Sequence, residues 1–469
     1  MFQLAILFVR SIVLARILGP EPFGVYGYAQ AIIAITIVIP SFGLGAAYLN
    51  RAAETEDRDA LAVHFTLTTL FSIAWAGLLL AAARLVSTSS AAWVLSIMVG
   101  AALLAQTVKS AQVRLMRLVT FRRVALVDLT IALTTTTAAV FLAFRGMGIW
   151  SLLSIDLVAA IVLVAGYYLV KPVWRPRLSL SKPIARYYVN YGRRVVMAQL
   201  LGLSNERLDA VWTGRYLGDA SLGLYGRAYA LATYPVRVVT TPLGGVASSI
   251  YAELKGDRSR LSRAFFLFNW LTIRVSFFLA GLLLLIAPDL VILLLGVQWL
   301  PMLGAFRVLV VYMMFAPVRY SIMDVFPVIG KPEILVRIQL AQLIVLIPLL
   351  YLLGSRLGME GVALAVGCMI VTGVVLALLR LRDDVDIPLG KLLVSPFAAV
   401  GLATVVTLLA GEAVPLHWGL LPRTVVETVG YALVYCVVTI VIEKRQVLEM
   451  VDLVKDPIRR QLKRSPLGP

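Results

Sequence analysis

Charged side chains inside apolar stretches are the residues of this sequence best suited to chemistry. They comprise seven arginines and four acids: Arg10, Arg207, Arg227, Arg237, Arg274, Arg307, Arg319, Asp156, Glu206, Asp209 and Asp324. An ionisable group at the centre of a bilayer costs about 2.5–3.5 kcal/mol on the most lenient insertion scale. Seven lipid-facing arginines would therefore cost about 20 kcal/mol, more than the stability of a typical fold. Most of them must face water, one another or a bound substrate.

Depth within the stretches separates structural charges from candidates for a binding site. Arg227, Arg307 and Asp324 lie near the ends of their stretches, where snorkelling or ion pairing accounts for them. The remaining five arginines are candidates for lining a substrate cavity: Arg10, Arg207, Arg237, Arg274 and Arg319. No paired-carboxylate, nucleophile or metal-ligating constellation accompanies them. Cys368 and Cys436 lie within apolar stretches without metal-ligand spacing, so we expect no metal, no cofactor and no enzyme.

The composition is that of an integral membrane protein. Hydrophobic residues make up 60% of the chain and charged residues 14%, where a soluble domain has about 25% charged residues. Apolar stretches of about 20 residues, enough to span hydrocarbon as a helix, recur along the chain. We count fourteen, namely residues 1–18, 25–49, 60–83, 91–108, 124–144, 149–170, 194–213, 223–250, 264–287, 301–325, 334–353, 358–379, 391–411 and 424–442. The sequence predicts an all-α membrane protein with about 14 transmembrane helices.

One segment of the chain occurs twice. Residues 16–29 (R-I-L-G-P-E-P-F-G-V-Y-G-Y-A) and 215–228 (R-Y-L-G-D-A-S-L-G-L-Y-G-R-A) align without a gap at an offset of 199 residues. The residues that mark the motif are Arg16, Gly19, Gly24 and Tyr26 in one copy and Arg215, Gly218, Gly223 and Tyr225 in the other. Such a repeat indicates one structural unit used twice. We predict that the motif is scaffold near an outer gate, with glycines for close helix approach; loop geometry alone explains them equally well.

The repeat sets the predicted domain boundaries. We expect a six-helix bundle in 1–170, a basic linker in 171–193, a second six-helix bundle in 194–380, two appended helices in 381–443 and a basic amphipathic cytoplasmic tail in 444–469. Six spans per half is an even number, so the bundles are parallel and related by a pseudo-twofold axis along the membrane normal. Fifteen residues precede Arg16, whereas 21 positions separate Arg194 from Arg215, so we expect a cytoplasmic lead-in before the first residue.

The net charge of +18 follows membrane orientation. Loops after even-numbered spans, together with the tail, hold 30 of the 43 lysines and arginines, and loops after odd-numbered spans hold six. By the positive-inside rule both termini are cytoplasmic. The basic excess indicates attraction to anionic membrane lipids and gives no reason to expect a nucleic-acid partner.

Motifs along nearly the whole chain resemble those of a known family. They are A-R-I-L-G-P-E-P-F-G-V-Y (15–26), S-F-G-L-G-A-A-Y-L-N-R (41–51), F-R-R-V-A-L-V-D (121–128), G-M-G-I-W-S-L (146–152), W-R-P-R-L (174–178), L-D-A-V-W-T-G-R-Y-L-G (208–218), L-G-L-Y-G-R-A-Y (222–229) and G-K-P (330–332). In these the chain resembles the polysaccharide transport (Wzx-like) flippases of the multidrug/oligosaccharidyl-lipid/polysaccharide exporter superfamily. The resemblance implies flipping of an undecaprenyl-pyrophosphate-linked oligosaccharide across the bacterial inner membrane, for O-antigen, capsule or exopolysaccharide export.

The implied cargo suits the arginines. Guanidinium groups keep their charge and present forked donors to phosphate oxygens, so a cationic central cavity would bind the pyrophosphate during alternating access. A polysaccharide polymerase and the export machinery are candidate partners. Coupling to H⁺ or Na⁺ through Asp209, Glu206 or Asp128, and flipping driven by consumption of the product, both stay open.

The repeat also pairs two charged positions. Subtracting the offset of 199 from Asp209 gives Arg10, so an arginine and an aspartate occupy equivalent positions on the first and seventh spans. We hypothesise that they pair in one conformation and separate when the cleft opens. The chain also resembles the related lipid II flippases at R-S-I-V-L-A-R (10–16), and these carry an arginine at the Arg10 position.

Two alternatives remain from the sequence. A cation-coupled multidrug antiporter of the same superfamily would be expected to carry deep acidic groups and fewer arginines. A membrane glycosyltransferase or polymerase would need catalytic groups in an outer loop, and the longest outer segments here, 288–300 and 412–423, are short and sparsely charged.

Overall fold

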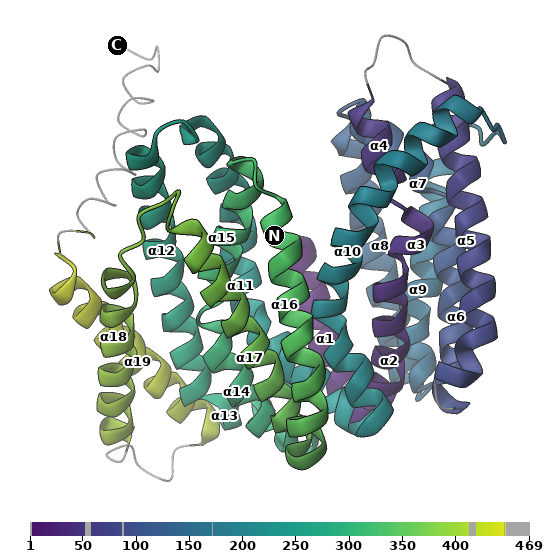
Figure 1. Ribbon diagram of the computed structural model, residues 1–469. Coiled ribbons are helices and arrows are strands. Elements are labelled where there is room, and N and C mark those ends of the chain that lie inside the picture. Colours follow the sequence, from purple (N-terminus) through teal and green to yellow (C-terminus); the bar gives the residue numbers. More distant parts are fainter. Residues whose placement is uncertain are drawn as a thin grey trace, which may run out of the picture. The chain divides into compact units, whose positions relative to one another are not determined.

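The computed structural model describes residues 2–51, 58–86, 89–170, 172–411, 419–444 and 446. These residues form helices and connecting segments without a β-strand (Figure 1). The first part of the chain contains α1 (Phe2–Leu18), α2 (Pro20–Thr36), α3 (Val38–Ser41), α4 (Leu44–Asn50), α5 (Arg58–Val86), α6 (Ser89–Gln106), α7 (Lys109–Arg117), α8 (Phe121–Phe144), α9 (Ile149–Val164) and the π-helical turn η1 (Ala165–Leu169).

The rest of the described chain contains a further set of helices. They are α10 (Lys182–Tyr216), α11 (Asp219–Leu254), α12 (Arg258–Leu285), α13 (Ala287–Leu294), the 3₁₀ turn η2 (Val297–Met302), α14 (Leu303–Met313), α15 (Ala316–Val328), α16 (Glu333–Leu349), the π-helical turn η3 (Leu350–Gly354), α17 (Ser355–Leu381), α18 (Leu389–Gly411) and α19 (Leu420–Ile442). The predicted amphipathic tail, 444–469, lies almost entirely outside the described residues.

The chain forms two compact units. Unit 1 comprises Met1–Ala228, Leu294–Ala305 and Gln342–Val366, and unit 2 comprises Tyr229–Leu293, Phe306–Ala341 and Gly367–Pro469. The units group residues by proximity and do not test the predicted division into repeated halves, which stays a prediction.

Helix length and apolarity confirm the predicted class of an all-helical membrane protein. Within the described residues nine segments are long and apolar enough to cross a membrane, and ten if the pair bent by 46° around α14 and α15 is one span. One segment, Glu333–Leu381, has 49 residues. A straight helix of that length would extend about 70 Å, more than twice the hydrocarbon thickness, and this one turns at Gly358, whose φ is +59°. The predicted number of fourteen helices stays a prediction.

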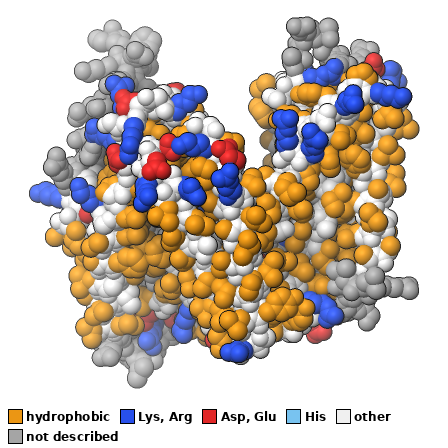
Figure 2. Space-filling model, in the orientation of Figure 1, with side chains coloured by type: hydrophobic (Ala, Val, Ile, Leu, Met, Phe, Trp, Pro, Cys, Tyr) orange, Lys and Arg blue, Asp and Glu red, His pale blue; other side chains and the backbone are white. Residues whose placement is uncertain are grey.

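The outward faces of these helices are apolar. Leu78, Leu409 and Leu433 are 73%, 64% and 63% exposed, respectively. Figure 2 shows apolar side chains along the flanks of the helices in each unit, with many lysines and arginines near helix ends. Water would penalise so much exposed apolar surface, whereas lipid covers it without cost. The chain is therefore a multi-pass membrane protein.

In unit 1, α8 packs along α9, α9 and α2 pack against α6, and α10 packs against α2 and α4. The apolar stretch 25–49 is divided into α2, α3 and α4 instead of forming one helix. Phe42 and Gly43 have left-handed φ values of 37° and 62°, and Gly192 of α10 lies against the Phe42 carbonyl, where a Cβ would overlap it. The break therefore follows from the close approach of α10, which hydropathy does not reveal.

The region of the predicted linker, 171–193, contains an extended segment and the start of a helix. Residues 172–181 are extended, and 182–193 belong to α10. Pro183, at the start of α10, begins the helix instead of breaking it, because the first turn of a helix has no partner for a backbone N–H.

In unit 2, α18 packs along α19, and both contact α12. Aromatic side chains fill this junction, with Phe278 of α12 beside Tyr431 and Tyr435 of α19 at centroid distances of 5.8 and 5.3 Å. The two helices predicted to be appended, α18 and α19, thus pack on α12.

Candidate functional site

The two copies of the repeated motif lie against each other in unit 1. Gly19 and Gly218, with φ values of +73° and +86°, precede α2 and α11, so each copy turns sharply into a helix. A Cβ at Gly24 would overlap the carbonyl oxygen of Asp219, and a Cβ at Gly223 would overlap that of Pro20. The two first helical turns therefore meet backbone to backbone, an approach that glycine alone permits.

The tyrosine of each copy binds a carboxylate. The Tyr26 hydroxyl donates to Oδ2 of Asp156 on α9 at 2.8 Å, and the Tyr225 hydroxyl donates to Oδ2 of Asp209 on α10 at 2.5 Å. Both tyrosines are buried, and Asp209 is only 3% exposed. The Ala210 amide donates to the other Asp209 oxygen at 2.8 Å. A buried carboxylate such as Asp209 needs such donors, and Tyr26 supplies one to the half-buried Asp156, so the tyrosines hold these two charges in place.

Two arginines lie beside Tyr26. Arg10 Nη1 donates to Thr135 Oγ1 of α8 at 2.9 Å, and its charge interacts with Asp156. Arg227 Nη1 donates to Ser11 Oγ, and its guanidinium lies 3.8 Å from the centroid of the Phe23 ring. We call Arg10, Tyr26, Asp156 and Arg227 the arginine cluster. Its two guanidinium groups interact with each other and outnumber its one carboxylate, so the cluster is cationic.

The end of α1 is fixed close to this cluster. Trp299 of η2 donates from Nε1 to the Ala15 carbonyl at 3.0 Å, and its ring meets Phe23 edge-on with centroids 5.8 Å apart. Gln298 Nε2 lies 3.3 Å from the Arg16 carbonyl, which accepts its hydrogen bond. Residues almost 300 positions later in the sequence thus contact the first motif copy and hold it in place.

The structure does not pair Arg10 with Asp209. Arg10 is held by Thr135 beside Asp156, and Asp209 is held by Tyr225 and interacts with Arg207. The two positions are equivalent in the repeat, but their side chains do not form a pair in this structure. Arg10 occupies the position equivalent to Asp209, and the carboxylate that Tyr26 binds comes instead from Asp156 of α9.

The other candidates have different surroundings. Glu206 is exposed on α10, and Asp128 of α8 interacts with the charge of Lys109. Arg319 of α15, in unit 2, lies over the Tyr320 ring with its guanidinium 5.0 Å from the ring centroid. The Arg237 side chain belongs to residues 234–243, which lie outside the described side chains.

Arg274 has a structural role instead of the predicted place in a cavity. It is 5% exposed, and its Nε donates to Glu443 at 2.8 Å, with a second contact from Nη2 to the same carboxylate. The remaining donors reach the carbonyls of Lys391 and Leu392 at 3.0 and 3.1 Å. With every nitrogen engaged, Arg274 binds α12 to the beginning of α18 and the end of α19. The hydropathy of the residues around Arg274 does not predict its partner, because Glu443 lies 169 positions later in the sequence.

Two members of the arginine cluster are not among the site residues predicted from the sequence. Arg227 lies near the end of its apolar stretch, which favours snorkelling or ion pairing, and Asp156 is not predicted as a site residue. The predicted scaffold role of Tyr26 is compatible with its hydrogen bond to Asp156. The sequence does carry one signal for Arg227. The two motif copies differ at this position, because Arg227 aligns with Tyr28 at the 199-residue offset. Among the described residues, no group of three potential metal ligands occurs.

The fold and these buried charges describe a multi-pass membrane protein with a cationic cluster held between its helices. Residues 13–304 match the profile of the polysaccharide biosynthesis protein family, and this region includes both motif copies. The chain belongs to that family. The match agrees with the resemblance carried by the sequence motifs.

Sequence relatives act in polysaccharide pathways. The succinoglycan biosynthesis transport protein ExoT of Rhizobium meliloti (strain 1021) is 29% identical over 316 residues, which cover 63% of this chain and 61% of ExoT. The teichuronic acid biosynthesis protein TuaB of Bacillus subtilis (strain 168) is 24% identical over 138 residues, 29% of each chain. The chain thus matches about three fifths of the length of ExoT and less than a third of TuaB.

Solved transporters share the fold. The lipid II flippase MurJ in an inward closed conformation has a TM-score of 0.73 at 14% identity, covering 95% of this chain and 99% of MurJ. An inward-facing multidrug resistance MATE family transporter of the MOP superfamily has a TM-score of 0.64 at 15% identity, covering 81% of this chain and 94% of that one. At these identities the likeness establishes the fold alone.

Proposed function

We propose that the protein flips a polyprenyl-pyrophosphate-linked oligosaccharide across the bacterial inner membrane for surface polysaccharide export. The observation that carries the proposal is the arginine cluster, two guanidinium groups and one carboxylate held between helices of a polysaccharide biosynthesis family member. An excess of buried positive charge suits an anionic cargo. The names of ExoT and MurJ, a transport protein and a flippase, support the same activity.

The chemistry of such a cargo explains why arginine is used. A pyrophosphate diester and its sugars lose hydration on leaving water, and fixed guanidinium donors replace part of it. Arg10 presents one nitrogen to Thr135, which leaves its other donors for phosphate oxygens. The polyprenyl tail would remain in lipid between helices. Alternating access around the site would complete the transfer, with both termini in the cytoplasm.

Arg207 and Arg319 remain proposed cavity residues, together with Arg237. The pairs of Tyr225 with Asp209 and Tyr26 with Asp156 are the sites we propose for any coupling to H⁺ or Na⁺. Flipping driven by consumption of the product is the alternative to coupling. A polysaccharide polymerase and export machinery are proposed partners.

A cation-coupled multidrug antiporter is the second candidate function. The buried carboxylate of Asp209 favours it, since such a group can bind a cation. The excess of arginine over carboxylate in the arginine cluster opposes it, because a cationic drug would be repelled there.

The test is deletion of the gene followed by analysis of lipid-linked sugars. We expect repeat units to accumulate on the cytoplasmic leaflet and surface polysaccharide to fall, with recovery when the wild-type gene is returned. The Arg10→Ala variant should fail to restore export, whereas Arg356→Ala, at an exposed position outside the cluster, should restore it. Normal surface polysaccharide in the deletion strain would overturn the flippase assignment.

A further inference from the structure

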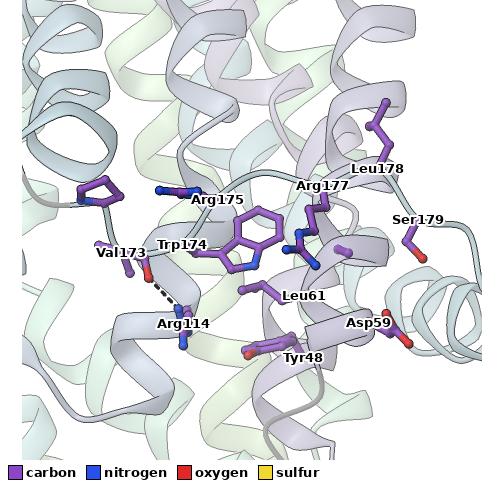
Figure 3. A pocket seen from close by; sticks show the side chains of 12 residues that line it. Tyr48, Asp59, Leu61, Arg114, Val173, Trp174, Arg175, Arg177, Leu178 and Ser179 are labelled. Atoms are coloured by element: carbon purple, nitrogen blue, oxygen red, sulfur yellow. Dashed lines mark hydrogen bonds between the residues drawn. The ribbon is translucent and has the colours of Figure 1, made fainter.

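A pocket in unit 1 lies apart from the arginine cluster. Its volume is about 710 Å³, and it lies where the segment 172–181 crosses the ends of α4, α5 and α7 (Figure 3). Its lining residues are Tyr48, Asp59, Leu61, Ala62, Arg114, Pro172, Val173, Trp174, Arg175, Arg177, Leu178 and Ser179. Nothing in the proposed transport site accounts for it.

The pocket has a fixed wall although much of it is an extended segment. Arg114 Nη1 donates to the Val173 carbonyl at 2.5 Å, and the Ser179 amide donates to Thr66 Oγ1 of α5 at 2.9 Å. The Trp174 ring packs edge-on against Phe65 at a centroid distance of 5.7 Å. These contacts hold both ends of the segment on the helices, Val173 and Trp174 at one end and Ser179 near the other, so the backbone that carries Arg175 and Arg177 spans two fixed points.

The lining is cationic. Arg114, Arg175 and Arg177 line the pocket together with a single acid, Asp59, which has a partner within the protein. Arg175 and Arg177 are exposed and form no hydrogen bond or ion pair with any described residue. In Figure 3 the Arg177 guanidinium points toward the space between Trp174 and Leu61. Two uncommitted guanidinium forks beside a cavity are suited to phosphate oxygens.

An apolar surface adjoins the charged lining. Leu178, within the lining, is 76% exposed, and Leu180 is 63% exposed. Leu169 and Val170, at the other end of the segment, are 74% and 84% exposed. A soluble anion gains nothing from such residues, whereas the chain of a lipid covers them while its headgroup enters the pocket. Trp174 and Tyr48 add the aromatic side chains typical of a membrane interface.

We propose that this pocket is a binding site for the phosphate headgroup of an amphipathic lipid. Arg175 and Arg177 bind the phosphate, Trp174 and Tyr48 flank the polar part of the headgroup, and Leu178 contacts its chain. Two lipids share this chemistry, an anionic phospholipid of the surrounding leaflet and a polyprenyl diphosphate. The site shares no residue with the arginine cluster, so lipid binding here can be tested, and can fail, separately from the proposed flipping activity.

The experiment measures lipid binding to the full chain in a neutral detergent by native mass spectrometry. The probes are dioleoylphosphatidylglycerol, a polyprenyl diphosphate, dioleoylphosphatidylcholine as the neutral lipid and inorganic phosphate. The test variant is Arg175→Gln/Arg177→Gln, and the matched control is Arg122→Gln/Arg186→Gln, which removes two exposed arginines outside the pocket. Both variants should unfold at the wild-type temperature, because none of these four side chains forms a hydrogen bond or ion pair with a described residue.

We expect the test variant to lose about tenfold in apparent affinity for the lipid that occupies the site, and the control variant to bind like wild type. A loss confined to phosphatidylglycerol identifies a phospholipid site, and a loss confined to polyprenyl diphosphate identifies a site for the cargo lipid. Equal affinities of test variant and wild type for both anionic lipids would overturn the proposal. So would wild-type binding of phosphatidylcholine or inorganic phosphate as strong as that of the anionic lipids.

Discussion

Gly24 of α2 and Gly223 of α11, equivalent positions of the repeated motif, lie in backbone contact. The Gly24 amide nitrogen is 3.2 Å from the position that a Cβ on Gly223 would occupy. Each glycine also lies against a carbonyl of the other motif copy, that of Asp219 or of Pro20. The sequence repeat is thus a structural contact as well as a sign of duplication.

Gly24→Ala and Gly223→Ala should each destabilise the protein. The added methyl group would overlap backbone that has no rotamer to adopt, so we expect a loss of about 1–3 kcal/mol or more in the free energy of unfolding. Thermal unfolding of the purified protein in detergent measures this as a lower midpoint temperature.

The same motif contains the matched controls. Gly27 and Gly226 are shared by both copies but have nothing within 4 Å of an added Cβ. Gly27→Ala and Gly226→Ala should therefore be neutral, or stabilise the helix by up to about 1 kcal/mol. Equal midpoints for Gly24→Ala and Gly27→Ala would show that the contact between the copies does not constrain the fold.

The helical class and the repeat could be predicted from hydropathy and self-similarity, because both are local properties of the chain. The break at Phe42 and Gly43 could not, since it depends on Gly192 of another helix. The site divides in the same way. The cost of burying a charge marks Arg10 and Arg274 equally as candidate site residues. Only the fold shows that Glu443 neutralises Arg274, whereas Arg10 lies in the cationic arginine cluster.

The Arg274–Glu443 pair should be required for stability and not for cargo binding. Arg274→Met would leave the Glu443 charge buried without its partner, which costs about 3–5 kcal/mol. The double variant Arg274→Met/Glu443→Met should recover much of that loss, since no unpaired charge remains. Thermal unfolding compares the three proteins. Loss of export by Arg274→Met at wild-type stability would instead return Arg274 to the substrate site.

The two motif tyrosines should differ in importance. Tyr225→Phe removes a donor from Asp209, which is 3% exposed, so we expect a loss of about 1–3 kcal/mol in unfolding free energy. Tyr26→Phe should cost less, because Asp156 is half-buried and interacts with Arg10. Tyr187→Phe, at a 37% exposed ring whose hydroxyl has no hydrogen bond with any described residue, is the control and should be neutral. A larger loss for Tyr26→Phe than for Tyr225→Phe would contradict this ordering.

Arg227 should require its guanidinium shape as well as its charge. Arg227→Lys keeps one positive charge, but an ammonium group cannot both lie flat over Phe23 and reach Ser11 with a forked donor. We expect export to fall several-fold in Arg227→Lys, whereas Arg10→Gln, which removes a charge, should lose about tenfold or more.

The measurement is surface polysaccharide per amount of folded protein in a deletion strain, with Arg356→Gln as the control. If Arg227→Lys exported at the wild-type level while Arg10→Gln did not, charge alone would be what the cluster supplies. If both variants exported at the wild-type level, transport would not depend on the arginine cluster. The excess positive charge of the cluster would then need an explanation other than phosphate binding.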